Sequence, residues 1–197
     1  MIMSKLYSTG QFVCRTFFRL FFRVRILGRE NIPEGEGVML CSNHINNLDP
    51  PLLGAFIKRQ TRYMAKSELF HAPLLKQLLP KLGAFPIKRG TSDRQALRNG
   101  LSLLKQEEVI GIFPEGTRSR TGELGEGMTG VGFFALRSQA VVIPCAVVGS
   151  YKPFSKLLLV YGEPLDMEKL RREKADAEEA TKEIMNGIQN LLDKYKK

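Results

Sequence analysis

Short apolar runs alternate with segments of helical periodicity along most of the chain. Runs of this length, bounded by glycine, proline and charged residues, are typical of buried strands and occur at 38–41, 61–65, 83–89, 109–113, 141–148 and 156–161. Helical patterns occupy residues 52–57, 74–82, 91–106 and 130–137. A last amphipathic helix carries its apolar residues at Ile184, Ile188, Leu191, Leu192 and Tyr195. Strands that alternate with helices indicate an α/β fold.

The segment 11–28 combines arginines with phenylalanines and contains no acidic residue. Arg15, Arg19 and Arg23 are spaced i, i+4, i+8, which makes one polar stripe on a helix. Four aromatic residues cover much of the remaining surface: Phe17, Phe18, Phe21 and Phe22. This pattern predicts a helix that lies in a membrane interface, with its arginines on lipid phosphates. The alternative is an amphipathic helix packed on the core of the domain.

Two other apolar segments have more than one possible placement. The first forms either a second apolar surface or part of the core, and we prefer the core; it contains Leu69, Phe70, Leu74, Leu75, Leu78 and Leu79. The second is the strand at 141–148, which contains Pro144. Because proline cannot donate a ladder hydrogen bond, we expect an edge, a bulge or a strand start there.

Composition narrows the class of protein and of partner. The 197 residues carry a formal net charge of +10, which favours anionic partners such as anionic lipid, phosphorylated substrates or nucleic acid. Nucleic acid is the weaker candidate, since no recognition motif accompanies the charge. The three cysteines lie far apart, without metal-ligand spacing, and predict a reducing compartment and no metal site. No apolar run approaches the roughly 18 residues of a spanning helix, and no signal peptide is visible.

His44 is one of two histidines and stands in a polar loop, five residues before Asp49. On a helix this spacing would place the two side chains on different faces, so they can meet only across a turn. The prolines at 50 and 51 favour a turn, followed by a helix with Asp49 as its N-cap. A neutral imidazole oriented by a carboxylate is the usual base for a hydroxyl group. The alternative is structural: Asp49 only caps the helix, and His44 only satisfies loop backbone.

Two further strand ends carry residues that suit phosphate. The strand at 83–89 ends in Lys88 and Arg89, which are either phosphate ligands or solvated cations. The strand at 109–113 leads into a turn that presents a carboxylate, a hydroxyl and a guanidinium together, from Glu115, Thr117 and Arg118. Gly116 allows this turn a positive φ or a close approach to a ligand. Ligand sites in α/β proteins gather outside strand ends, so these residues form a candidate site.

In combination, these segments resemble the glycerolipid acyltransferases. Residues 44–49 match the H-x4-D motif of that family, and residues 113–119 read FPEGTRS. Residues 83–89 and 142–147 are similar to its two other blocks, and all four occur in order between residues 43 and 148. The length and the short N-terminal helix resemble most closely the bacterial 1-acyl-sn-glycerol-3-phosphate acyltransferases.

The resemblance implies a mixed, mostly parallel sheet flanked by helices. From the N-terminal pattern we expect residues 1–28 to form the membrane-association helix and residues 29–197 the acyltransferase domain, whereas many members of the family carry longer hydrophobic N-terminal segments. The resemblance also implies that His44 takes the proton from the sn-2 hydroxyl of lysophosphatidic acid while that hydroxyl attacks a thioester, and that Asp49 orients His44. Residues expected to bind the substrates are Lys88, Arg89, Glu115, Gly116, Thr117, Arg118 and Pro144, the last on the acyl side.

No cofactor or metal is implied; the acyl donor is acyl-CoA or acyl carrier protein, and composition does not separate them. We expect peripheral, monotopic attachment to an anionic membrane surface on the cytoplasmic side. Three alternatives remain open: acylation of another lysolipid or of glycerol 3-phosphate, a membrane-associated thioesterase that uses water, and a lipid-binding protein without catalysis.

Overall fold

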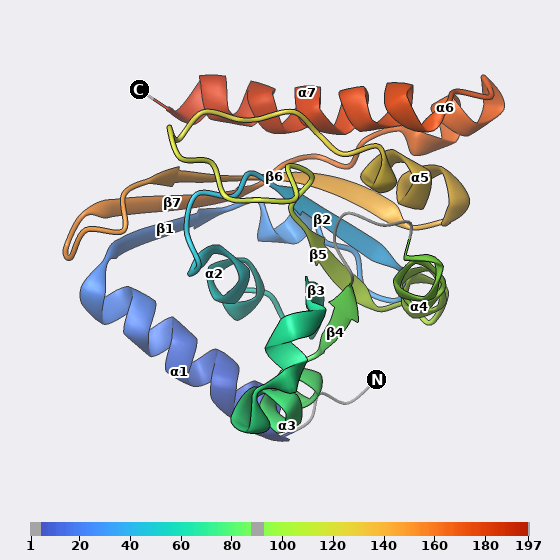
Figure 1. Cartoon of the computed structure of the whole chain (residues 1–197). Coiled ribbons are helices and arrows are strands. Elements are labelled where there is room, and N and C mark those ends of the chain that lie inside the picture. The colour runs from blue at the N-terminus through green and yellow to red at the C-terminus, as the bar shows by residue number, and fades with distance from the viewer. Residues whose placement is uncertain (1–4, 88–92, 197) are drawn as a thin grey trace.

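The structure is a computed structural model that describes residues 5–87 and 93–196 (Figure 1). The described residues form one seven-stranded sheet in the order β1-β7-β6-β2-β5-β3-β4. The strands are β1 (Arg23–Leu27), β2 (Val38–Ser42), β3 (Thr61–Lys66), β4 (Ala84–Ile87), β5 (Val109–Ile112), β6 (Val141–Gly149) and β7 (Lys156–Tyr161). All neighbouring pairs within it are parallel except β6 and β7. The predicted mixed, mostly parallel sheet is therefore confirmed.

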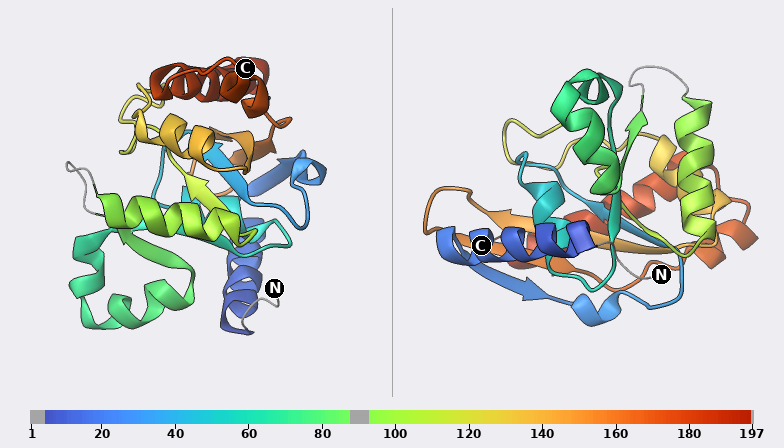
Figure 2. Two further views of the ribbon diagram at one scale, coloured as in Figure 1. Left: turned by 90° about the vertical axis from the view of Figure 1, so that its right-hand side faces the viewer. Right: turned by 90° about the horizontal axis from the view of Figure 1, so that it is seen from below.

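Helices cover both faces of the sheet (Figure 1). They are α1 (Lys5–Phe21), α2 (Asp49–Ala55), α3 (Pro73–Lys81), α4 (Arg94–Lys105), α5 (Gly130–Arg137), α6 (Met167–Arg172) and α7 (Ala177–Tyr195), with short 3-10 helices η1 (Arg29–Asn31) and η2 (Ser67–His71). Figure 2 shows α1 and α3 on one side of the sheet and α7 on the other. Each face has its own apolar core, because the strands send alternate side chains to opposite faces.

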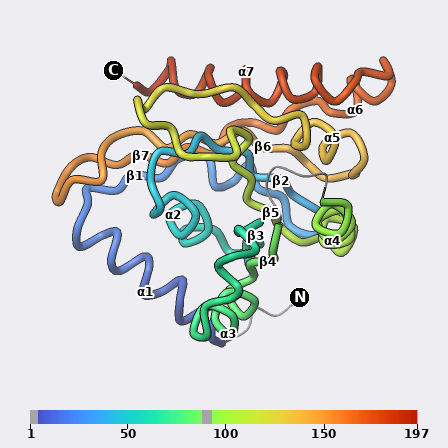
Figure 3. Tube along the Cα trace, viewed as in Figure 1, coloured from blue at the N-terminus to red at the C-terminus, as the bar shows by residue number. Residues whose placement is uncertain are grey.

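The N-terminal helix ends earlier than predicted. It stops at Phe21, and the trace continues directly into β1, which pairs in parallel with β7 (Figure 3). The reason lies in residues 23–27, Arg-Val-Arg-Ile-Leu, whose early alternation of charged and apolar residues has the period of a strand. The expected boundary at residue 28 is wrong, since β1 belongs to the sheet. Among the described residues, no helix is both long and apolar enough to cross a membrane.

Pro144 lies inside the sheet, so the expected edge, bulge or strand start is wrong. β6 runs between β2 and β7, and Pro144 pairs with Cys41 of β2. The Pro144 carbonyl accepts a hydrogen bond from Gly162 N–H at 2.7 Å, just beyond the end of β7. Because the N–H and C=O of a strand residue point to the same side, the missing donor also falls where β7 has ended. The proline therefore removes little of the hydrogen bonding between β6 and its neighbours.

The segment from η2 to α3 does not enter the core, which corrects the preferred interpretation of residues 69–79. No residue of α3 is buried. Leu69, Leu74 and Leu78 are exposed. Leu69 and Leu79 line the cavity described below. The apolar character of this segment therefore forms a surface and a cavity wall, which was the alternative interpretation.

Candidate active site

Two neighbouring strands bring the candidate site together. β2 and β5 are parallel neighbours, so the loops that follow them leave the same edge of the sheet. The loop after β2 carries His44, and the loop after β5 carries residues 113–118. A hydrogen bond of 2.7 Å from Ser119 N–H to the His44 carbonyl ties the two loops together.

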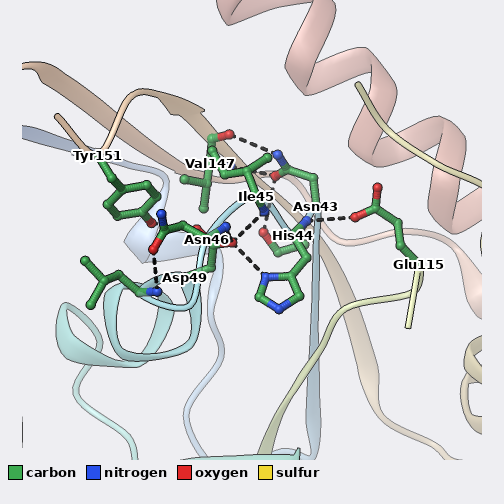
Figure 4. A network of polar contacts seen from close by, with 10 residues as sticks. Asn43, His44, Ile45, Asn46, Asp49, Glu115, Val147 and Tyr151 are labelled. Carbon is green, nitrogen blue, oxygen red and sulfur yellow. Dashed lines mark hydrogen bonds and ion pairs between the residues drawn. The ribbon is translucent and has the colours of Figure 1, made fainter. Parts of the chain in front are cut away.

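His44 and Asp49 meet across a turn, as the sequence predicts. His44 Nδ1 lies 2.8 Å from Asp49 Oδ2 (Figure 4). The same oxygen accepts the backbone N–H groups of Ile45 at 2.6 Å and Asn46 at 2.7 Å. The predicted N-cap role of Asp49 is wrong: Leu48 is the N-cap of α2, and the carboxylate turns back to the loop, away from the helical N–H groups. Asp49 therefore serves the loop and the imidazole.

The surroundings of Asp49 fix the tautomer of the imidazole. Asp49 is fully buried, and its Oδ1 accepts the hydroxyl of Tyr151 at 2.6 Å. An ionised carboxylate can only accept hydrogen bonds, so His44 Nδ1 carries the proton and Nε2 keeps its lone pair. The imidazole is stacked on the Phe113 ring, with centroids 4.2 Å apart. The result is an imidazole with a defined orientation, whose Nε2 can act as a base.

Tyr151 remains a hydrogen-bond donor at ordinary pH. Burial raises the pKa of its phenol well above the usual range, and the negative charge of Asp49 raises it further. The sequence gives no sign of this contact, because Tyr151 and Asp49 are 102 positions apart.

Asn43 holds the strand end that carries His44. Its amide donates to the Val147 carbonyl at 3.0 Å and accepts the Val147 N–H at 2.8 Å, so the side chain extends the pairing of β2 with β6 (Figure 4). Asn43 is buried. Asn43 directly precedes His44 in the sequence, and the structure shows the partner that holds it.

Glu115 binds backbone groups of the site and is not among the residues that line the cavity. Its carboxylate accepts the backbone N–H of His44 at 2.8 Å and that of Gly125 at 2.7 Å. Gly116 has the predicted positive φ, 66°, and a Cβ at this position would lie 2.3 Å from the Met128 sulfur. Both residues thus shape the loop.

A cavity of about 770 Å³ opens beside His44. Thr117 and Arg118 line it together with His44, so the structure brings these three candidate residues together. The other walls come from α1, α2, β3 and the η2–α3 segment, and they include Cys14, Ala55, Met64, Leu69, Leu79 and Leu82. An apolar chamber with a base and a guanidinium suits a ligand that has both a hydrocarbon part and an anionic group.

Three further residues are expected to bind the substrates: Pro144, Lys88 and Arg89. Pro144 is buried in β6 and lies against Gly187 of α7, on the face of the sheet opposite to α1 and α2. It is not among the cavity-lining residues, and its expected place beside the acyl chain stays a prediction. Lys88 and Arg89 lie outside the described residues.

The N-terminal residues divide between the core and the surface. Phe18 and Phe22 are buried against the sheet, whereas Phe17 and Phe21 are exposed. Arg15 does not reach outward: its guanidinium donates to the carbonyls of Ala55 and Ile57 at the end of α2. Arg19 stacks over the Phe56 ring at 5.9 Å, and Arg23 lies in β1. The continuous arginine stripe expected on one helix is therefore wrong.

Comparison with known proteins places this site in a family. The family model described as Acyltransferase matches residues 23–148, a stretch that contains both loops of the site. The chain belongs to the acyltransferase family. The resemblance seen in the sequence is confirmed, and the match includes β1, which the sequence analysis assigned to the N-terminal helix.

Individual acyltransferases are similar over most of the chain. The 1-acyl-sn-glycerol-3-phosphate acyltransferase of Bacillus subtilis is 34% identical over 148 residues, covering 72% of this chain and 73% of that protein. The chloroplastic enzyme LPAT1 of Arabidopsis thaliana is 30% identical over 67% of this chain, which spans only 38% of that relative. The crystal structure of the 1-acyl-sn-glycerophosphate (LPA) acyltransferase PlsC from Thermotoga maritima aligns with a TM-score of 0.74 and 26% identity, covering 95% of this chain and 78% of that one.

Proposed function

We propose that this acyltransferase transfers an acyl chain from a thioester to the sn-2 hydroxyl of lysophosphatidic acid and forms phosphatidic acid. The observation that carries the proposal is the position of His44. It is oriented by Asp49 and lines a cavity with apolar walls and a guanidinium, that of Arg118. The names of the relatives from Bacillus and Thermotoga support the same acceptor.

In the proposed reaction, His44 acts as the general base. Its Nε2 takes the proton of the sn-2 hydroxyl while the hydroxyl oxygen attacks the thioester carbonyl carbon. Asp49 stabilises the imidazolium that forms. The tetrahedral intermediate then expels the thiolate, which receives the proton back from His44. A C–O bond forms and a C–S bond breaks, so the proposed reaction needs no acyl-enzyme, cofactor or metal.

Phosphate recognition completes the proposal. Arg118 lines the same cavity as His44, and its guanidinium can bind a phosphate through two parallel hydrogen bonds. Lys88 and Arg89, which follow β4 in the sequence, are proposed as the further phosphate ligands. The net charge of +10 suits both candidate donors, acyl-CoA and acyl carrier protein, since both are acidic.

We also propose that the protein attaches peripherally to an anionic membrane surface on the cytoplasmic side. Support comes from one surface, called here the apolar face of α1, which consists of the exposed residues Leu6, Phe12, Val13, Phe17, Leu20 and Phe21. Exposed Phe154 lies beside it, because its N–H donates to the Phe21 carbonyl at 2.6 Å. Large exposed apolar surfaces on single helices are typical of membrane-interface attachment.

Acyl transfer by the purified protein in mixed micelles tests the proposed function. Lysophosphatidic acid is supplied first with a long-chain acyl-CoA and then with acyl carrier protein thioester. His44→Ala should lower phosphatidic acid formation by roughly 1,000-fold, within the range for a lost general base. His71→Ala is the matched control, because His71 is the other histidine and is exposed on η2. Thioester consumption without phosphatidic acid would instead identify hydrolysis or another acceptor.

A further inference from the structure

Tyr151 contacts the proposed dyad from a part of the chain outside both active-site loops. It follows β6 in the connection to β7, and its hydroxyl donates to Asp49 Oδ1 at 2.6 Å (Figure 4). We propose that Tyr151 is a positioning residue for the dyad: it holds the Asp49 carboxylate so that the other oxygen faces His44. The inference rests on the proposed function, in which His44 is the base.

The division of contacts between the two carboxylate oxygens supports this role. All three loop donors converge on Oδ2: the imidazole Nδ1 and the N–H groups of Ile45 and Asn46. Contacts to one oxygen alone leave the carboxylate free to pivot about that oxygen. The Tyr151 hydroxyl fixes the second oxygen, and the two held oxygens together with the covalent bond to Cβ define the plane of the carboxylate. The orientation of His44 therefore depends on a residue that does not touch it.

Tyr151 is itself held rigidly. Its ring packs edge-on against Phe22, with centroids 5.8 Å apart and planes at 81°. The connection that carries it is tied to the end of α1 by two backbone bonds, from Phe154 N–H to the Phe21 carbonyl at 2.6 Å and from Arg23 N–H to the Ser155 carbonyl at 2.9 Å. A donor held by ring packing and by backbone hydrogen bonds is what a positioning role requires.

The hydroxyl also tunes the carboxylate. A hydrogen bond to Oδ1 draws negative charge away from Oδ2, so the imidazolium is stabilised less than it would be without Tyr151. Loss of the hydroxyl should therefore make His44 easier to protonate. Within residues 5–87 and 93–196, the other charged groups around the site are Glu115, on the backbone of His44, and Lys66 and Arg118 in the lining of the same cavity. A change at Tyr151 leaves all three in place.

The variant Tyr151→Phe keeps the ring and its packing on Phe22 and removes only the hydroxyl. With lysophosphatidic acid and acyl-CoA, we expect kcat to fall about 10-fold, because a less well oriented base loses part of the rate gain that positioning supplies, with KM unchanged. The acid limb of the pH–rate profile should move to higher pH. Tyr161→Phe is the matched control, because it removes a buried hydroxyl that donates to the Leu53 carbonyl at 2.6 Å, away from the dyad.

A second measurement needs no substrate. The protein has two histidines, so NMR can follow protonation of His44 with exposed His71 as the internal reference. In Tyr151→Phe, protonation of His44 should shift to higher pH while that of His71 stays unchanged. Tyr161→Phe should shift neither. The proposal is overturned if both tyrosine variants have the same kcat and the same His44 titration as wild type. A shift at His44 in a protein that does not acylate lysophosphatidic acid would support the positioning role and reject the proposed acceptor.

Discussion

Replacing Asn43 by alanine tests how the end of β2 holds the base in place. The substitution removes both hydrogen bonds to Val147 and leaves a buried N–H and a buried carbonyl without partners. Each such group costs roughly 1–3 kcal/mol, so the free energy of unfolding should fall by roughly 2–6 kcal/mol. This is a large part of the roughly 5–15 kcal/mol that stabilises a domain.

Urea unfolding followed by circular dichroism measures this loss. In thermal unfolding, the melting temperature should fall by at least roughly 4 °C, since 1 kcal/mol corresponds to roughly 2–4 °C in a chain of this size. Asn31→Ala is a matched control: Asn31 also donates to two backbone carbonyls, those of Tyr161 and Gly162, but it is only partly buried. Water can replace its bonds, so its loss should cost about 1 kcal/mol. Equal costs for the two variants would refute the argument from burial.

Three further predictions concern the surface, the cavity and the core. Phe12→Ser combined with Leu20→Ser should weaken flotation with anionic liposomes at least about tenfold, whereas Met128→Ser, at another exposed position, should not weaken it. Equal losses of flotation in the two variants would reject the apolar face of α1 as the attachment site. Point substitutions test this surface better than deletion of the N-terminal segment, because a deletion through residue 27 would also remove β1. Arg118→Gln should raise KM for lysophosphatidic acid about tenfold, and Arg120→Gln, at an exposed position outside the cavity lining, should leave it unchanged. Burial raises the pKa of the Cys41 thiol to about 12, so the folded thiol stays protonated where the unfolded one ionises. The free energy of unfolding should therefore decline as pH rises from about 9 toward 12, and it should decline less in Cys41→Ala than in wild type. The same decline of the urea midpoint with pH in both proteins would contradict this prediction.

The sequence predicts what depends on local pattern. The strands of the sheet interior, the helix at 130–137 and the turn between His44 and Asp49 follow from apolar runs, periodicity and turn-forming residues. The positive φ of Gly116 was predicted for the same reason, since the turn is a local structure.

Contacts between distant segments decide the features that the sequence does not reveal. Arg15 looks like the first member of a lipid-facing stripe, yet its partners lie at the end of α2. Arg23 fits both the helical spacing of the arginines and the alternation of a strand, and pairing with β7 decides for the strand. Tyr151 has no motif around it, and only the fold brings it to Asp49.

The pairing of β1 with β7 has a consequence for how the chain is made. β1 leaves the ribosome early, but its partner residues begin at Lys156. At synthesis rates of roughly 5–20 residues per second, the interval is on the order of 10 s. Throughout it, the nascent chain carries an unpaired strand next to a helix rich in phenylalanine, and long-range pairing of this kind also closes slowly. Chains stalled before Lys156 are therefore the forms of this protein most prone to aggregate, and those for which early capture by a chaperone or a membrane matters most.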